Sequence, residues 1–161
     1  MALVKIAIVG IGNPLLTDDA IGLIAAEGLY ELNRYTFGCL LIKHSDDMLS
    51  LLNELTEFDV AFIIDSFRKE ESIGEVYEIK FEDGKLPRFV SPHTLSFTNS
   101  LSLFEASKIK LPKIILCGIS VKDAITFGDK ITVEVEQKLP EIIDSLNKFF
   151  NAKLKQLELL N

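Results

Sequence analysis

The segment that most constrains the fold runs from residue 8 to residue 22, where an apolar stretch enters a glycine turn and two adjacent acids open a helical pattern. The apolar residues, which begin at about residue 3, do not alternate with polar ones, as is typical of a strand covered on both faces. In open α/β sheets, ligands bind outside the carboxyl ends of the strands, where turns lead into helices. Asp18 and Asp19 therefore lie where a binding cleft is expected.

The following residues repeat this alternation of strand and helix. Apolar runs at residues 37–42, 58–64 and 113–119 have the length of buried strands. Apolar residues recur at helical spacing over residues 21–32, before the run at 37–42, and over residues 48–55, before the run at 58–64. The order strand, helix, strand, helix, strand predicts a doubly wound α/β domain with right-handed crossovers.

The second half of the chain predicts three more elements. Residues 74–81 alternate apolar and polar side chains and end in a turn at residues 82–84, which indicates an edge strand that can run antiparallel to the others. Helices are expected over residues 95–106 and from about Thr132 onward. With no linker or repeat along the chain, residues 1–161 are expected to form one domain.

Composition excludes several classes of protein. The net charge is −7 and the lysines are scattered rather than gathered in a stripe, which argues against a nucleic-acid partner. No uninterrupted apolar run approaches the ~18 residues that span a bilayer, and the first residues do not have the pattern of a signal peptide. Cys39 and Cys117 lie in apolar runs and are expected to be buried and reduced. We therefore expect a cytoplasmic protein with no membrane partner, and, in the absence of heptads or a long bare edge, a monomer.

Two further side chains are candidates for the same cleft. Asp65 follows the third apolar run, so the sheet should present it at the same edge as the glycine turn. His93 is expected on a loop before the helix at residues 95–106, because Pro92 favours an extended conformation at Ser91. Two carboxylates and an imidazole suit a divalent transition metal such as nickel or zinc, and suit calcium poorly.

Each candidate also has a simpler explanation. Asp18 and Asp19 can complement the helix dipole, Asp65 can cap a turn, and His93 can be a hydrogen-bonded loop residue. The glycine turn could instead bind a nucleotide. Leu15 replaces the third glycine of that fingerprint and the two acids would repel a pyrophosphate, so no nucleotide cofactor is expected.

Taken together, GIGNPL at residues 10–15, the acids Asp18 and Asp19 with a later glycine, Asp65, and the Ser-Pro-His of residues 91–93 resemble the hydrogenase maturation endopeptidases. The resemblance covers essentially the whole chain. It implies a three-layer α/β/α sandwich with a five-stranded, mostly parallel mixed sheet in which one strand is antiparallel. It also implies an endopeptidase that removes the C-terminal extension of a nickel-iron hydrogenase large-subunit precursor after nickel insertion.

The same resemblance assigns roles within the site. The metal-interacting and catalytic positions of the family fall on Asp19, Asp65 and His93, and Asp18 is expected to orient Asp19 from behind. The nickel is expected to be presented by the precursor, which is the protein partner. In cleavage, this metal can polarise the peptide carbonyl or generate hydroxide from bound water, and the sequence does not choose between the two.

The chain departs from the family in two loops. Residues 43–48 replace an Asp-Gly-Gly-Thr type loop, and the loss of both glycines changes the backbone conformations permitted at the cleft rim, where the substrate is selected. Val121-Lys122 replace a Pro-Glu pair. His44, within the first of these loops, is either an additional ligand or a residue of the cleft rim. The alternative function is a nickel-dependent binding or chaperone module for a hydrogenase-like subunit, without proteolysis.

Overall fold

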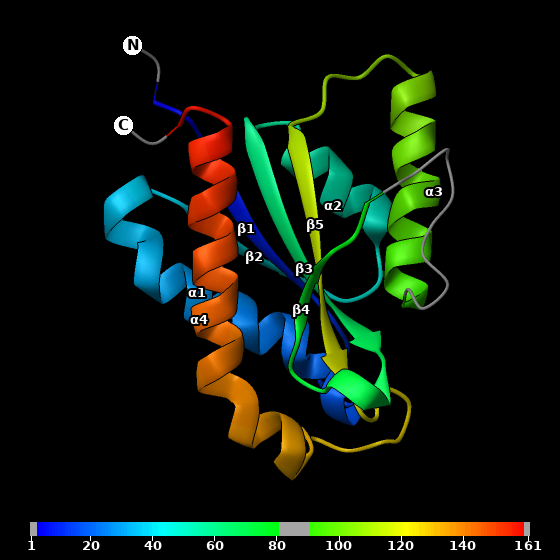
Figure 1. Ribbon diagram of the computed structural model, residues 1–161. Helices are drawn as coiled ribbons and strands as arrows, with labels where there is room; N and C mark the ends of the chain where they lie inside the picture. The colour runs from blue at the N-terminus through cyan, green and yellow to red at the C-terminus, as the bar shows by residue number, and fades with distance from the viewer. Residues whose placement is uncertain (1–2, 81–90, 160–161) are drawn as a thin grey trace.

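The computed structural model describes residues 3–80 and 91–159, which build a sheet of five strands between two layers of helices (Figure 1). The strands are β1 (Ile6–Ile11), β2 (Leu40–His44), β3 (Val60–Arg68), β4 (Val76–Glu78) and β5 (Lys113–Val121). The helices are α1 (Ile21–Phe37), α2 (Met48–Leu55), α3 (Pro92–Ala106) and α4 (Val133–Gln156), with short 3₁₀ turns η1 (Thr17–Ala20) and η2 (Glu70–Ser72).

The strand order in the sheet is β2-β1-β3-β5-β4. The first four strands in this order are parallel, and β4 pairs antiparallel to β5 at the edge. This topology confirms the predicted mixed sheet and the predicted edge strand, which is shorter than the alternation suggested. The predicted turn at residues 82–84 lies outside the described residues.

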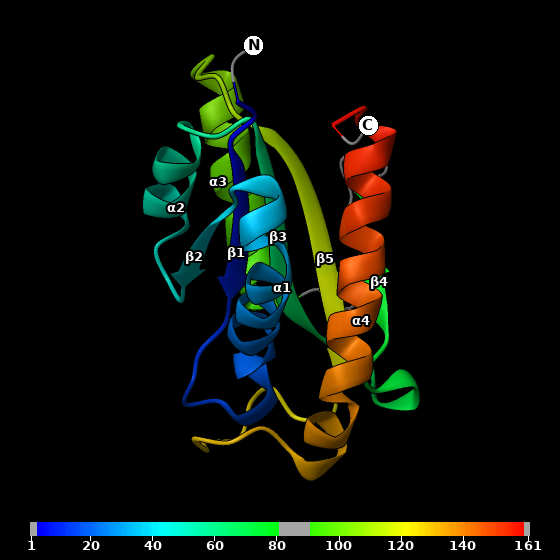
Figure 2. The same ribbon diagram turned by 90° about the vertical axis from the view of Figure 1, so that its left-hand side faces the viewer.

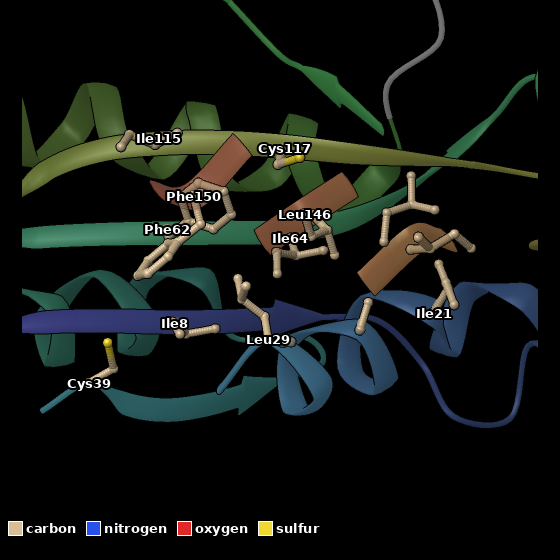
Figure 3. Packing of buried hydrophobic residues seen from close by; sticks show 14 of the residues in the cluster. Ile8, Ile21, Leu29, Cys39, Phe62, Ile64, Ile115, Cys117, Leu146 and Phe150 are labelled. Carbon is tan, nitrogen blue, oxygen red and sulfur yellow. The ribbon is translucent and has the colours of Figure 1, made fainter. Parts of the chain in front are cut away.

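The helices cover the two faces of the sheet in pairs, α1 and α4 on one side and α2 and α3 on the other (Figure 2). Under α1 and α4, the ring of Phe62 on β3 packs against Phe150 (Figure 3), with ring centroids 5.3 Å apart. It also packs against Phe149, with ring centroids 5.5 Å apart. Under α2 and α3, a second cluster includes Leu51, Leu52 and Phe97. The central strands β1, β3 and β5 are therefore buried on both faces, which explains why their sequences do not alternate.

Helix α1 begins so close to the sheet that there is no room for a side chain at Gly22. A Cβ at this position would lie 2.1 Å from the Ile11 carbonyl oxygen and 2.8 Å from that of Ile64. Gly10 is also tightly packed, since its Cβ would meet the Gly22 oxygen at 2.6 Å. These contacts place η1, which carries Asp18 and Asp19, against the end of the sheet.

The segment between α1 and β2 differs from the expectation. Helix α1 continues to Phe37 and ends at Gly38, which has the left-handed conformation (φ 61°) that favours glycine. Strand β2 consequently begins only at Leu40, so Cys39 precedes the strand instead of lying within it. Both Cys39 and Cys117 are buried and free, as predicted.

Two predicted boundaries near the site were wrong. Helix α3 begins at Pro92 rather than Leu95, because the Ser91 side chain accepts a hydrogen bond from Thr94 N–H and proline is favourable in the first helical turn. His93 thus lies in the helix and not on a loop. Asp65 does not end β3, because pairing with β5 continues as far as Arg68.

In the ranges 3–80 and 91–159, no helix combines the length and apolar character needed to cross a bilayer.

Candidate active site

The candidate site forms where β1 stops and β3 continues. Gly10 of β1 is in register with Ile64, so β3 extends past the end of β1 at Ile11, and among the described strands this extension pairs with β5 alone. The η1 turn packs against this extension, in the lower part of the molecule as drawn in Figure 1. Asp65 and Ser66 belong to the extension, and Asp19 approaches them from η1.

Asp19 is the hydrogen-bonding centre of the site. Its Oδ2 accepts from the main-chain N–H of Asn13 at 2.8 Å and lies 2.9 Å from His93 Nε2. Its Oδ1 accepts from the Ser66 hydroxyl at 2.7 Å. Burial, with only 4% of the residue exposed, raises the pKa of Asp19, but the hydrogen bonds from His93, Ser66 and Asn13 outweigh it and hold the pKa below its usual value. Asp19 is therefore ionised near neutral pH.

Asp65 is fully buried and surrounded by hydroxyl groups. Its Oδ2 accepts from Ser91 and, at 2.9 Å, from Thr94, both at the start of α3. Its Oδ1 accepts from the main-chain N–H of Ser66 at 2.7 Å. Burial raises the pKa of Asp65 to about 6, although the Ser91 hydrogen bond, the nearby His93 and the Thr94 hydrogen bond each lower it. This carboxyl group can therefore gain or lose a proton close to neutral pH.

His93 projects from the first turn of α3 and connects that helix to η1. The hydrogen bond to Asp19 raises the pKa of His93, burial opposes this, and the charges of Asp65, Asp19 and Asp46 raise it further. Because a carboxylate only accepts hydrogen bonds, we assign a proton to Nε2, so His93 donates to Asp19. The structure thus brings together the three predicted residues Asp19, Asp65 and His93.

Asp18 points to a different part of the molecule. It is fully buried, and its carboxylate accepts from the main-chain N–H groups of Lys122 (3.3 Å), Asp123 (3.0 Å) and Thr132 (2.6 Å), and from the Thr132 hydroxyl (3.0 Å). All of these donors belong to the segment between β5 and α4. Its described hydrogen bonds include none to Asp19 or His93, so the observed role of Asp18 is to anchor this segment to η1.

Asp19, Asp65 and His93 offer the oxygen and nitrogen ligands that nickel or zinc can bind, but these atoms already take part in hydrogen bonds within the protein. His93 hydrogen-bonds to Asp19 Oδ2, and Asp65 accepts hydrogen bonds from Ser66, Ser91 and Thr94. Over residues 3–80 and 91–159 there is no group of three or more His, Cys, Asp or Glu side chains arranged to hold a metal ion. This arrangement does not fit a resident metal centre; a metal could reach Asp19 Oδ2 only if His93 moved.

His44 stands at the end of β2, where its carbonyl oxygen accepts from Gly12 N–H at 3.2 Å. Its Nδ1 is buried and has no hydrogen-bond partner among the described residues. Asp46, two residues later, is close enough to influence the pKa of His93. The loop at residues 43–48, which differs from the family pattern, thus adjoins the site. Among the described residues, His44 belongs to no group of side chains arranged to hold a metal ion.

Sequence reasoning missed the hydroxyl groups of the site: Ser66, Ser91 and Thr94. A signal for Ser91 was present, because a serine followed by a proline is a typical helix start, in which the serine side chain accepts from the main-chain N–H three residues later. Here that residue is Thr94. No local signal distinguishes Ser66 from any other strand serine.

Comparisons with known proteins indicate the family to which the chain belongs. The family model for hydrogenase maturation proteases matches residues 46–148. The hydrogenase expression/formation protein HoxM of Azotobacter vinelandii is 25% identical over 140 residues, which cover 84% of this chain and 67% of that protein.

Two solved structures share the fold. The [NiFe] hydrogenase maturation protease HybD from Thermococcus kodakarensis has a TM-score of 0.68 and 24% identity, over 90% of this chain and 98% of that one. The hydrogenase maturating endopeptidase HybD from E. coli has a TM-score of 0.68 and 22% identity, over 94% of this chain and 93% of that one.

The sandwich fold, with acids and a histidine at the carboxyl edge of its sheet, is the fold that the chain shares with these two solved structures. Because the family model covers more than half of the chain, the chain belongs to the hydrogenase maturation protease family. Its activity class is accordingly that of an endopeptidase in hydrogenase maturation.

Proposed function

We propose that this protein removes the C-terminal extension from a nickel-iron hydrogenase large-subunit precursor, and that nickel already seated in the precursor is part of its substrate. The observation that carries the proposal is the pairing of Asp19 with His93 at 2.9 Å beside the buried Asp65. Asp19 and His93 would each ligate a metal, so a metal ion can replace their mutual hydrogen bond with a bond to each of them. Family membership supplies the reaction class.

The residues would act in a defined order. When the precursor docks, His93 leaves Asp19 Oδ2, while Asp19 keeps its hydrogen bonds to Ser66 and to Asn13 N–H and so keeps its orientation. Both groups can then face the nickel of the precursor, and docking without nickel leaves them paired. Metal occupancy is thereby checked before cleavage.

Asp65 is suited to handling a proton in this reaction. Its pKa of about 6 lets it accept a proton from an attacking water and return it to the leaving amine at neutral pH. The nickel of the precursor would polarise the scissile carbonyl or lower the pKa of bound water to ~7.

A cleavage assay on nickel-loaded and nickel-free precursor, followed by intact mass, tests the proposal. We expect loss of a C-terminal peptide only from the loaded form, and no loss with Asp19→Ala. Asp144→Asn is the matched control, because Asp144 is an exposed acid of α4 that pairs only with Lys148 among the described residues.

A folded wild-type protein that cleaves neither form would contradict the proposal. If such a protein still bound the nickel-loaded precursor, the non-proteolytic binding module would be the better assignment.

A further inference from the structure

Ser66 is the one described residue that donates hydrogen bonds to both acids of the site. Its hydroxyl donates to Asp19 Oδ1 and its main-chain N–H donates to Asp65 Oδ1, each at 2.7 Å. It lies in the interior of β3 and is 1% exposed. Successive side chains of a strand point to opposite faces, so Ser66 and Asp65 leave β3 in opposite directions. Asp65 meets α3, whereas Ser66 meets η1.

The two oxygens of Asp19 are consequently held by different kinds of partner. Oδ1 is bound by a buried hydroxyl on the sheet, and Oδ2 is bound by Asn13 N–H and by the side chain of His93. When His93 departs, a carboxylate without Ser66 would be held only on the Oδ2 side and could rotate about its own axis. With Ser66 in place, the carboxylate plane stays fixed.

We propose that Ser66 is a positioning residue of the cleavage reaction: it holds Asp19 in the orientation that lets His93 separate from it and both groups face the metal of the substrate. This rests on the proposed function. Ser66 is buried beneath Asp19 and acts through it, so its loss should affect the chemical step and leave precursor binding unchanged.

Ser66→Ala is a clean test, because it removes the hydroxyl bond to Asp19 and keeps the main-chain bond to Asp65. With nickel-loaded precursor, we expect kcat to fall about 10- to 100-fold, the usual effect of losing a group that orients a metal-facing ligand, with KM changed less than about twofold. Ser66→Thr keeps the hydroxyl and should recover most of kcat. Ser66→Cys, a weaker donor of similar size, should be intermediate and serves if the threonine variant is poorly folded.

Ser120→Ala is the matched control. Ser120 lies on the neighbouring strand β5, is fully buried and also uses its hydroxyl in hydrogen bonds, but its described partners are main-chain groups of Ser72 and Glu75. It removes a comparable buried hydroxyl without contact with either acid, so any general loss of stability appears in it too. We expect its kcat to stay within about twofold of wild type.

A second readout needs no substrate. In ¹⁵N NMR spectra of the isolated protein, the His93 Nε2 proton should be sharp in wild type and Ser120→Ala, and broadened by exchange in Ser66→Ala, because Asp19 is no longer fixed. An unchanged His93 signal or an unchanged kcat in Ser66→Ala would overturn the proposal. So would a rise in KM alone, or a folded Ser66→Thr as impaired as Ser66→Ala. If wild type cleaves no precursor, the proposed function fails, and the His93 signal still decides whether Ser66 positions Asp19.

Discussion

At the scale of single residues, Asp65 carries an energetic cost. Its neighbours are hydroxyls and one N–H rather than a direct cationic partner, and they do not fully replace the water lost on burial. Its folded pKa of about 6 lies above the 3.8 of an ordinary Asp. Between these values the folded state binds more protons than the unfolded state, so this residue makes stability fall as pH rises from about 4 to 6.

Asp65→Asn should therefore stabilise the protein at pH 7. The amide oxygen can still accept from Ser66 N–H, and the amide nitrogen can donate to the hydroxyls of Ser91 and Thr94. Thermal unfolding at a series of pH values should show a gain that grows from pH 4 to 6 and is constant above, up to about 3 kcal/mol. A variant less stable than wild type at pH 7, or a pH-independent difference, would show that the carboxylate is not the costly form.

Asp18→Asn should act in the opposite direction. Both oxygens of the Asp18 carboxylate accept hydrogen bonds from main-chain N–H groups. An asparagine would replace one of these oxygens with an NH₂ group, which would face an N–H donor. Loss of charge-assisted hydrogen bonds in a buried site predicts a cost of about 2–4 kcal/mol in urea unfolding. Asp144→Asn, on the exposed surface of α4, should be close to wild type. An equal effect of both substitutions would contradict the anchoring role.

The two adjacent acids also show what sequence reasoning could and could not predict. The sequence predicted that Asp19, Asp65 and His93 lie close together, because turns that follow strands and lead into helices meet at one edge of the sheet, and the structure places them there. The division of labour between Asp18 and Asp19 depends on the tight η1 turn, in which Thr17 has a positive φ of 49°. Such a backbone conformation is rare for a β-branched residue, and no local pattern indicates it.

At the scale of elements, the junction of η1, α1 and the sheet determines where Asp19 lies. Gly22→Ala would place a methyl group within 2.1 Å of the Ile11 oxygen, and a main-chain atom in a sheet cannot move aside cheaply. We expect a loss of about 3–5 kcal/mol or failure to fold, measured by urea unfolding.

Gly28→Ala is the control within the same helix. The three atoms nearest to a Cβ at this position all belong to the side chain of Ile143, which can change rotamer, and alanine favours a helix by about 1 kcal/mol over glycine. We expect a change within about 1 kcal/mol. Similar losses at Gly22 and Gly28 would mean that the close approach to the sheet is unimportant.

The elements themselves were largely predictable, while their ends were less so. Apolar runs and helical spacing identified β1, β2, β3 and β5 and the helices α1 and α2, because buried apolar residues leave a strong pattern, although Leu32 and Leu49 of the predicted apolar stripes are exposed. The ends of β3 and α1 depend on pairing with β5 and on Gly38, which are contributions of tertiary structure.

At the scale of the whole molecule, the sheet joins two hydrophobic clusters that share no helix. Phe62→Ala would open a cavity beneath α4, and Leu52→Ala would open one beneath α2, at costs of about 3–5 and 2–5 kcal/mol. Each should lower the urea midpoint without changing the slope m, because both faces belong to one cooperative unit. Two separate transitions in either variant would show that the layers unfold independently.

The attachment of the β5–α4 segment has a consequence for how the protein can diversify. The segment is tied to η1 through its main chain, at Lys122, Asp123 and Gly128, with Thr132 adding its hydroxyl. The side chains of Ile125 and Phe127 are 68% and 85% exposed and take no part in the attachment. Residues at these positions can be exchanged while the anchorage persists, so the surface of this segment is open to change by evolution or by engineering without rebuilding Asp18 or the η1 turn.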